Sequence, residues 1–161
     1  MMNAHSDTTT ITTAQAIVFE PTSAGGGSLW EGDNLLATLT VLKRTERQGR
    51  LSLRGTNNAY DLLRSTRQQH VSYRMVQVLR QVADADWNTG DPSATLHYQG
   101  QDYLATPESL LSIRGDRLLL TLALAPDWTA RQTELGVVGV ADLPLIAFYL
   151  FVAYDLSQSA R

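Results

Sequence analysis

The sequence predicts a mainly β (α+β) domain that ends in one hydrophobic helix. Several short segments alternate apolar and polar residues with a period of two, which is typical of half-buried strands. Turn-forming residues, mostly glycine, asparagine and aspartate, separate these segments. The third observation is the run between Asp142 and Asp155, in which every side chain is apolar or aromatic.

Size and composition are those of one globular domain. The chain has 161 residues, of which 43% are hydrophobic and 18% charged, and its formal net charge is −3. A nucleic-acid binder would show a basic excess, so we expect no nucleic-acid partner. The absence of cysteine excludes disulfides and thiolate chemistry. Residues 1–13 have no basic and apolar leader, which favours a cytoplasmic location.

The chain divides into three parts. Residues 1–28 are predicted to be a flexible N-terminal tail and a glycine-rich connector, because 1–13 is polar and 21–28 contains three consecutive glycines. Ala14–Glu20 is a possible first strand within this part. Residues 29–156 are predicted to be one β-rich domain, and residues 157–161 a polar tail.

The first clear strand is Leu35–Lys43, where leucines and threonines alternate between two faces. A basic cluster follows it, made of Lys43, Arg44, Arg47, Arg50 and Arg54. One interpretation is a site for phosphate groups or an anionic membrane surface. The other is a solvated hairpin edge, where charge discourages pairing between sheets.

A short pattern occurs twice. L-S-L-R-G at 51–55 and L-S-I-R-G at 111–115 each combine a strand-like run with a glycine, and each precedes another strand-like run. The pattern predicts a strand, a tight turn and a second strand in both places.

One segment in the middle of the chain fits both a helix and a strand. His70–Val82 has an apolar stripe at helical spacing, but it is also rich in residues that favour strands, so both interpretations stay open. Asp84–Ser93 is predicted to be an acidic, turn-rich loop. Residues 94–106 are predicted to form a hairpin that bends at Gly100.

The terminal apolar run is predicted to be a helix over residues 143–156. Asp142 can cap its first turn, and Pro144 is tolerated there because its missing N–H is not needed. The apolar side chains point in all directions, as in a helix that is surrounded by protein or by lipid. The run is shorter than the roughly 20 apolar residues of a membrane span, so we expect a buried core helix and no transmembrane span.

No catalytic site is predicted. The three histidines show no metal-ligand spacing, and no nucleophile motif accompanies them, so we expect neither an enzyme nor a cofactor. Asp61 and Asp155 are acids beside apolar runs, where burial can raise a pKa. Such acids more often cap an element or pair with an arginine.

Two stretches resemble the tubby-like superfamily, which includes the scramblase and LURP-one-related proteins. They are L-L-S-I-R-G-D-R-L-L-L at 110–120 and L-I-A-F-Y-L-F-V-A-Y-D at 145–155, with 51–55 as an earlier unit. The resemblance implies a twisted β-barrel, or wrapped sheet, that encloses the hydrophobic helix. It implies lipid binding only for some members, and their basic pairs have no match here residue by residue.

Two functions follow from these observations. The first is a non-enzymatic domain that lies peripheral to a membrane and binds an anionic phospholipid or a protein partner through its surface, with the Lys43–Arg54 cluster as the candidate site. The second is a small structural protein whose apolar C-terminal helix docks on a membrane or a partner subunit.

Overall fold

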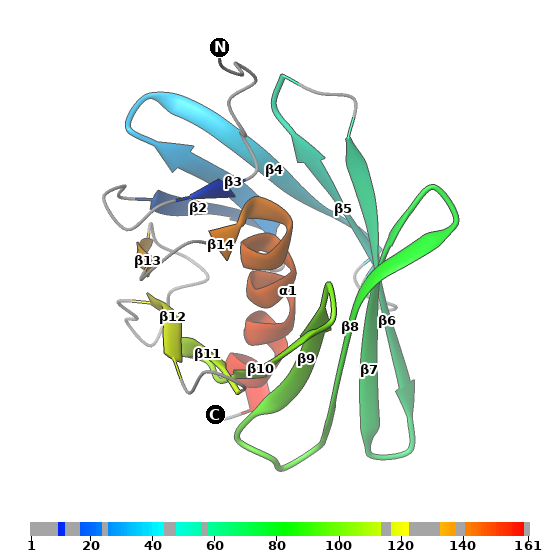
Figure 1. The fold of residues 1–161 in the computed structure, drawn as a ribbon. Helices are drawn as coiled ribbons and strands as arrows, with labels where there is room; N and C mark the ends of the chain where they lie inside the picture. Colours follow the sequence, from blue (N-terminus) through cyan, green and yellow to red (C-terminus); the bar gives the residue numbers. More distant parts are fainter. Residues whose placement is uncertain are drawn as a thin grey trace.

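A computed structural model of the chain shows one helix among antiparallel strands (Figure 1). The structure describes residues 10–11, 17–23, 26–43, 48–55, 58–113, 117–122, 133–137 and 141–159. The strands are β1 (Thr10–Ile11), β2 (Ile17–Ser23), β3 (Gly26–Glu31), β4 (Asn34–Lys43), β5 (Gln48–Leu53), β6 (Ala59–Arg67), β7 (His70–Gln77), β8 (Arg80–Asn88), β9 (Ala94–Tyr98), β10 (Gln101–Ala105), β11 (Ser109–Ser112), β12 (Arg117–Leu122), β13 (Thr133–Val137) and β14 (Ala141–Asp142). The helix is α1 (Leu143–Ser159). The predicted fold class, mainly β with a C-terminal helix, is confirmed.

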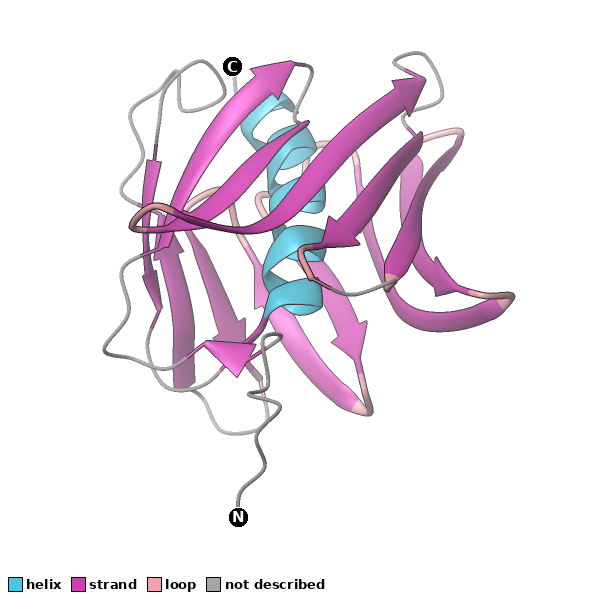
Figure 2. Ribbon diagram, turned by 90° about the horizontal axis from the view of Figure 1, so that it is seen from above, coloured by secondary structure: helices cyan, strands magenta, loops and turns pink. Residues whose placement is uncertain are grey.

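The strands pair in chain order. From β2 to β13 each strand pairs antiparallel with the next, and β13 pairs back with β2 through Leu135 and Ile17. The order of pairing therefore returns to its first strand. A separate two-stranded sheet joins β1 to β14 just before the helix. Seen from above, strands lie on both sides of the helix (Figure 2).

The helix prediction is confirmed, and the burial of the helix is close to complete. Leu143 and residues 145–153 are 0–3% exposed, and Pro144 is buried too, so the buried side chains face every direction around the axis. A helix in this setting needs no polar face, which explains its uniformly apolar sequence. In the described part of the chain, no helix is both long enough and apolar enough to cross a membrane. The helix continues to Ser159, so the predicted polar tail from residue 157 is wrong for its first three residues.

The predicted flexible connector at 21–28 is wrong where the structure describes it. Pro21 belongs to β2, and Gly26 and Gly27 are buried residues of β3. A Cβ atom at Gly27 would lie 2.7 Å from the Phe19 ring on the paired strand. The glycine is therefore needed for close packing, not for flexibility. The domain also starts earlier than residue 29, because β2 is part of its sheet.

The predicted N-terminal tail is largely outside the described residues, which omit 1–9 and 12–16. Thr10 and Ile11 are exceptions, because they pair with Asp142 and Ala141.

The ambiguous segment 70–82 is a hairpin. Val71, Tyr73 and Met75 point inward from β7 and are buried, while Val78 and Leu79 form the turn to β8. Pairing with β6 on one side and β8 on the other satisfies the backbone, and this outweighs the helical stripe.

The predicted loop at Asp84–Ser93 is wrong in its first half, because β8 runs on to Asn88. The alanines Ala83 and Ala85 and the ring of Trp87 face inward there, and the acids alternate outward. The period of two thus places an acidic sequence in a strand.

The strands on both sides of each copy of the repeated pattern are confirmed, and so is the predicted hairpin at 94–106. The first copy ends β5, with Arg54 and Gly55 in the turn and a φ of 78° at Gly55. The second copy covers the end of β11, with Ile113 in the turn, and its last residues lie outside the described ones. Strands β9 and β10 meet at Gly100, as predicted.

Candidate functional site

Two members of the predicted basic cluster, Lys43 and Arg54, lie at opposite ends of β5. Lys43 pairs with Gln48 at the β4–β5 connection, whereas Arg54 follows the other end of β5. The six residues of β5 separate the two ends by about 20 Å, at roughly 3.3 Å per residue. Arg44 and Arg47 lie outside the described residues, and so does the side chain of Lys43.

Arg50 is exposed between these two ends and forms an ion pair. Its Nε lies 3.3 Å from Oδ1 of Asp61 on the neighbouring strand. Asp61 is exposed as well, so it is a surface partner of the arginine and not a buried acid. The pair neutralises the middle of the predicted cluster.

Two basic residues that the sequence did not group together, three strands apart, lie at the end of the sheet where β5 finishes. Because β5 and β7 run in the same direction, both strands finish at one edge of the sheet, which we name the β7–β8 edge. Arg54 follows β5 at this edge, and Arg80 starts β8 there. Both side chains are exposed. The residues are 26 positions apart in the sequence, so only strand pairing brings them to the same edge.

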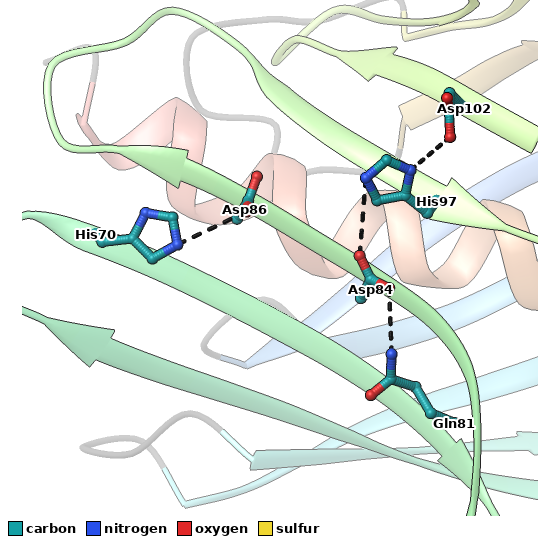
Figure 3. Close-up of polar contacts among 6 residues, drawn as sticks. All are labelled: His70, Gln81, Asp84, Asp86, His97 and Asp102. Atoms are coloured by element: carbon teal, nitrogen blue, oxygen red, sulfur yellow. Dashed lines mark hydrogen bonds and ion pairs between the residues drawn. The ribbon is translucent and has the colours of Figure 1, made fainter.

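The densest group of titratable side chains lies on the outer face of β7 to β10 (Figure 3). His97 Nδ1 lies 2.5 Å from Asp102 Oδ1, and its Nε2 lies 3.9 Å from Asp84 Oδ1. The hydrogen bond with Asp102 raises the pKa of His97; nearby carboxylates add to the rise, and partial burial opposes it.

His70, on β7, also faces polar side chains of β8. Its Nε2 lies 3.7 Å from Asp86 Oδ2, and its Nδ1 lies 3.1 Å from the Asn88 side-chain amide oxygen.

Both ring nitrogens of His97 face carboxylates, so neither is placed to activate a hydroxyl. Opposite charges across strands stabilise a sheet, and this arrangement has that geometry.

Metal-ligand geometry does not occur within the described ranges. No group of three or more histidine, cysteine, aspartate or glutamate side chains there is arranged to hold a metal ion.

A buried polar network fixes the C-terminal half of the helix. Tyr73 donates to Asp155 at 2.8 Å, and the Trp87 indole donates to the Tyr73 hydroxyl at 2.8 Å. Arg64 Nε lies 2.9 Å from the same Asp155 oxygen. Burial and the Asp155 charge raise the pKa of Tyr73. The network joins β6, β7 and β8 to α1, so Asp155 pairs with an arginine, as the sequence favours.

Two further tyrosines position the rest of the helix. Tyr98 donates to Asp142 at 3.1 Å beside the first turn of α1. Tyr149 donates to the Thr106 carbonyl at 2.8 Å. Burial raises the pKa of both hydroxyls, so they act as neutral donors.

The structure also contains one open cleft of about 370 Å³ near the C-terminal end of α1. Its walls come from two loops and the helix, and its lining residues are Gly90, Asp91, Pro92, Thr106, Pro107, Glu108 and Leu156. Asp91 Oδ2 already accepts a hydrogen bond from the backbone N–H of Asn88, so this carboxylate stabilises its own loop. The cleft shows no convergent set of polar groups that would define a ligand.

Comparison with known proteins assigns no family. No family model matches the chain, and no curated protein and no solved structure matches it either.

Proposed function

We propose that the chain is a non-enzymatic binding domain of the tubby-like type, in which the helix is a structural core and the outer surface recognises anionic phospholipid. The observation that carries the proposal is the burial of α1: ten of its first eleven residues are at most 3% exposed among the strands, and the other, Pro144, is buried as well. An enclosed helix within a twisted barrel is what the resemblance implies. Phospholipid must then bind to the outer surface of the sheet and not to the helix.

The polar groups of the described residues support a binding role. Asp155 serves the attachment of the helix, and His97 lies within a cross-strand row of charges. Side chains used in this way are not available as a nucleophile and base pair.

The burial of the helix favours this proposal over the second function considered from the sequence. Docking through α1 would need accessible apolar side chains, but Phe148, Phe151 and Val152 are 0% exposed. Releasing them would require the sheet to open. We therefore propose that any membrane contact is peripheral and made by the sheet.

The β7–β8 edge is the surface that we assign to phospholipid. Arg54 and Arg80 are both exposed there, and a guanidinium binds phosphate oxygens through paired hydrogen bonds. Arg50, by contrast, already has Asp61 as its partner. The negative inner surface of the plasma membrane would attract such an edge, in keeping with a cytoplasmic location.

Co-sedimentation with lipid vesicles tests this function. The vesicles contain phosphatidylcholine and phosphatidylserine in a three-to-one ratio. Each basic residue near such a surface contributes about 1 kcal/mol, so Arg54→Ala with Arg80→Ala should weaken binding by about 2 kcal/mol, or roughly thirtyfold. The salt dependence of binding should also become shallower.

Arg44→Ala with Arg47→Ala is the matched control, since it removes the same charge elsewhere. It should bind nearly as well as the parent. Loss of binding only in this control would move the contact to the β4–β5 connection. If the parent chain binds these vesicles no better than vesicles of phosphatidylcholine alone, the phospholipid function is wrong, and a protein partner becomes the better hypothesis.

A further inference from the structure

The turn between β7 and β8 combines two unusual properties. Val78 and Leu79 are 88% and 100% exposed, and their φ angles are 46° and 64°. The turn is the green loop at the right of Figure 1. It therefore presents two large apolar side chains to solvent from a left-handed backbone.

Folding alone does not favour these residues at this place. Gln77 pairs with Arg80, so the hairpin has two connecting residues, both with positive φ. Such turns strongly favour Asn-Gly, and a β-branched valine is among the least favoured residues there. Because the side chains are so exposed, packing within the chain does not offset the strain. A strained backbone that internal packing does not require points to a role in binding another molecule.

The chemistry of the edge fits the boundary region of a lipid bilayer. Val78 and Leu79 form the tip, Arg80 follows at once, and Arg54 lies at the same edge. This order matches the depth profile of a bilayer, with acyl chains inside and phosphate groups outside. A protein interface would need about 800 Å² from each partner, which a convex two-residue tip does not provide alone.

A third apolar side chain supports this orientation. Ile113, 49% exposed, follows β11, which runs in the same direction as β7. Three of the four large hydrophobic side chains exposed in the described residues thus lie at strand ends of one polarity; Leu42 is the exception.

We infer that the Val78–Leu79 turn inserts its two side chains into the bilayer while Arg80 and Arg54 bind lipid phosphates. The inference rests on the proposed phospholipid function and adds an apolar anchor to it. It predicts that binding has a part that salt does not screen.

The first test replaces the anchor with the pair that the turn prefers. Val78→Asn with Leu79→Gly should bind the phosphatidylserine vesicles about tenfold more weakly, which corresponds to about 1.4 kcal/mol. The salt dependence should remain that of the parent, unlike in the arginine variant. The melting temperature should stay equal or rise, because the new residues relieve the strain. Unchanged affinity in a parent that does bind vesicles would overturn the anchor but keep the phospholipid function.

The second test does not depend on the stability of that variant. The chain has no cysteine, so Leu79→Cys provides a single site for an environment-sensitive NBD label. Vesicles should shift its emission to the blue, and nitroxide-labelled lipids should quench it. Gln68→Cys is the matched control, because Gln68 is an exposed positive-φ residue in the turn at the opposite end of β7. Bound protein without a shift at position 79, or with equal shifts at both positions, would rule out insertion of this turn.

Discussion

At the scale of single residues, the surface charges act through their neighbours across strands. His97 is the clearest example, because a hydrogen bond with Asp102 raises its pKa above the usual 6.5. The folded chain therefore holds the proton more tightly than the unfolded chain. The resulting stabilisation is fully present below the unfolded pKa and is lost as the pH rises through the folded pKa. Since the ring is about half exposed, solvent screens the effect.

Asp102→Asn should lower the pKa of His97, because it removes the largest cause of the rise. An NMR titration of the histidine ring protons measures this directly. The control Asp86→Asn also removes one negative charge, but Asp86 contributes less to the rise in the His97 pKa. It should therefore lower that pKa by a smaller amount. Equal shifts in the two variants would mean that a general field, and not the hydrogen bond, sets the pKa.

At the scale of elements, the glycines of β3 show how closely the strands approach the core. Gly27→Ala places a methyl group against the Phe19 ring and the Glu20 carbonyl of β2. We expect a loss of about 1–3 kcal/mol in the free energy of unfolding, as in other overpacked cores.

Ser28→Ala, at the adjacent position of the same strand, should change stability much less. Chemical denaturation compares the two variants. In a flexible connector, glycine to alanine would be neutral or stabilising by about 0.4–1 kcal/mol, because the unfolded chain loses freedom. The sign of the change therefore decides between a packed strand and a connector.

At the scale of the whole molecule, the helix is the shared core of nearly all the strands. Each large apolar side chain of α1 contributes roughly 1.5–3 kcal/mol on burial, whereas a domain is stable by only about 5–15 kcal/mol in total. A chain that ends at Ala141 should therefore show no cooperative thermal transition. Calorimetry or near-ultraviolet circular dichroism measures this.

Phe148→Asp in the full chain should be almost as damaging, because it buries an unpaired charge where a fully buried ring was. Phe148→Leu is the matched control and should keep a cooperative, less stable transition. A sharp transition in the 1–141 fragment would show that the sheet has a core of its own.

The predictions that succeeded depended on local pattern. An apolar run without a polar face needs apolar surroundings on every side, and this run is short for a membrane span, so a buried α1 could be predicted from its own residues. Alternation in Leu35–Lys43 and the glycine turns at Gly55 and Gly100 likewise needed only neighbouring residues.

The segment that stayed open and the prediction that failed both depended on partners distant in the sequence. Residues 70–82 satisfy both periodicities, and pairing with β6 and β8 decided for strands. The glycines of residues 21–28 predict a connector, but the Phe19 ring on the paired strand lies so close to Gly27 that only glycine fits there. In both cases backbone pairing and packing outweighed local preference.

Residue type and the periodicity of the apolar residues are enough to predict a mainly β chain with an enclosed helix, because they define which side chains must be buried. The tertiary structure decided which charges and apolar side chains share a surface. It separated Lys43 from Arg54 along one strand, and it brought Arg54, Arg80 and the Val78–Leu79 turn to one edge. Proximity across strands depends on register and strand direction, which arise only when the whole sheet forms.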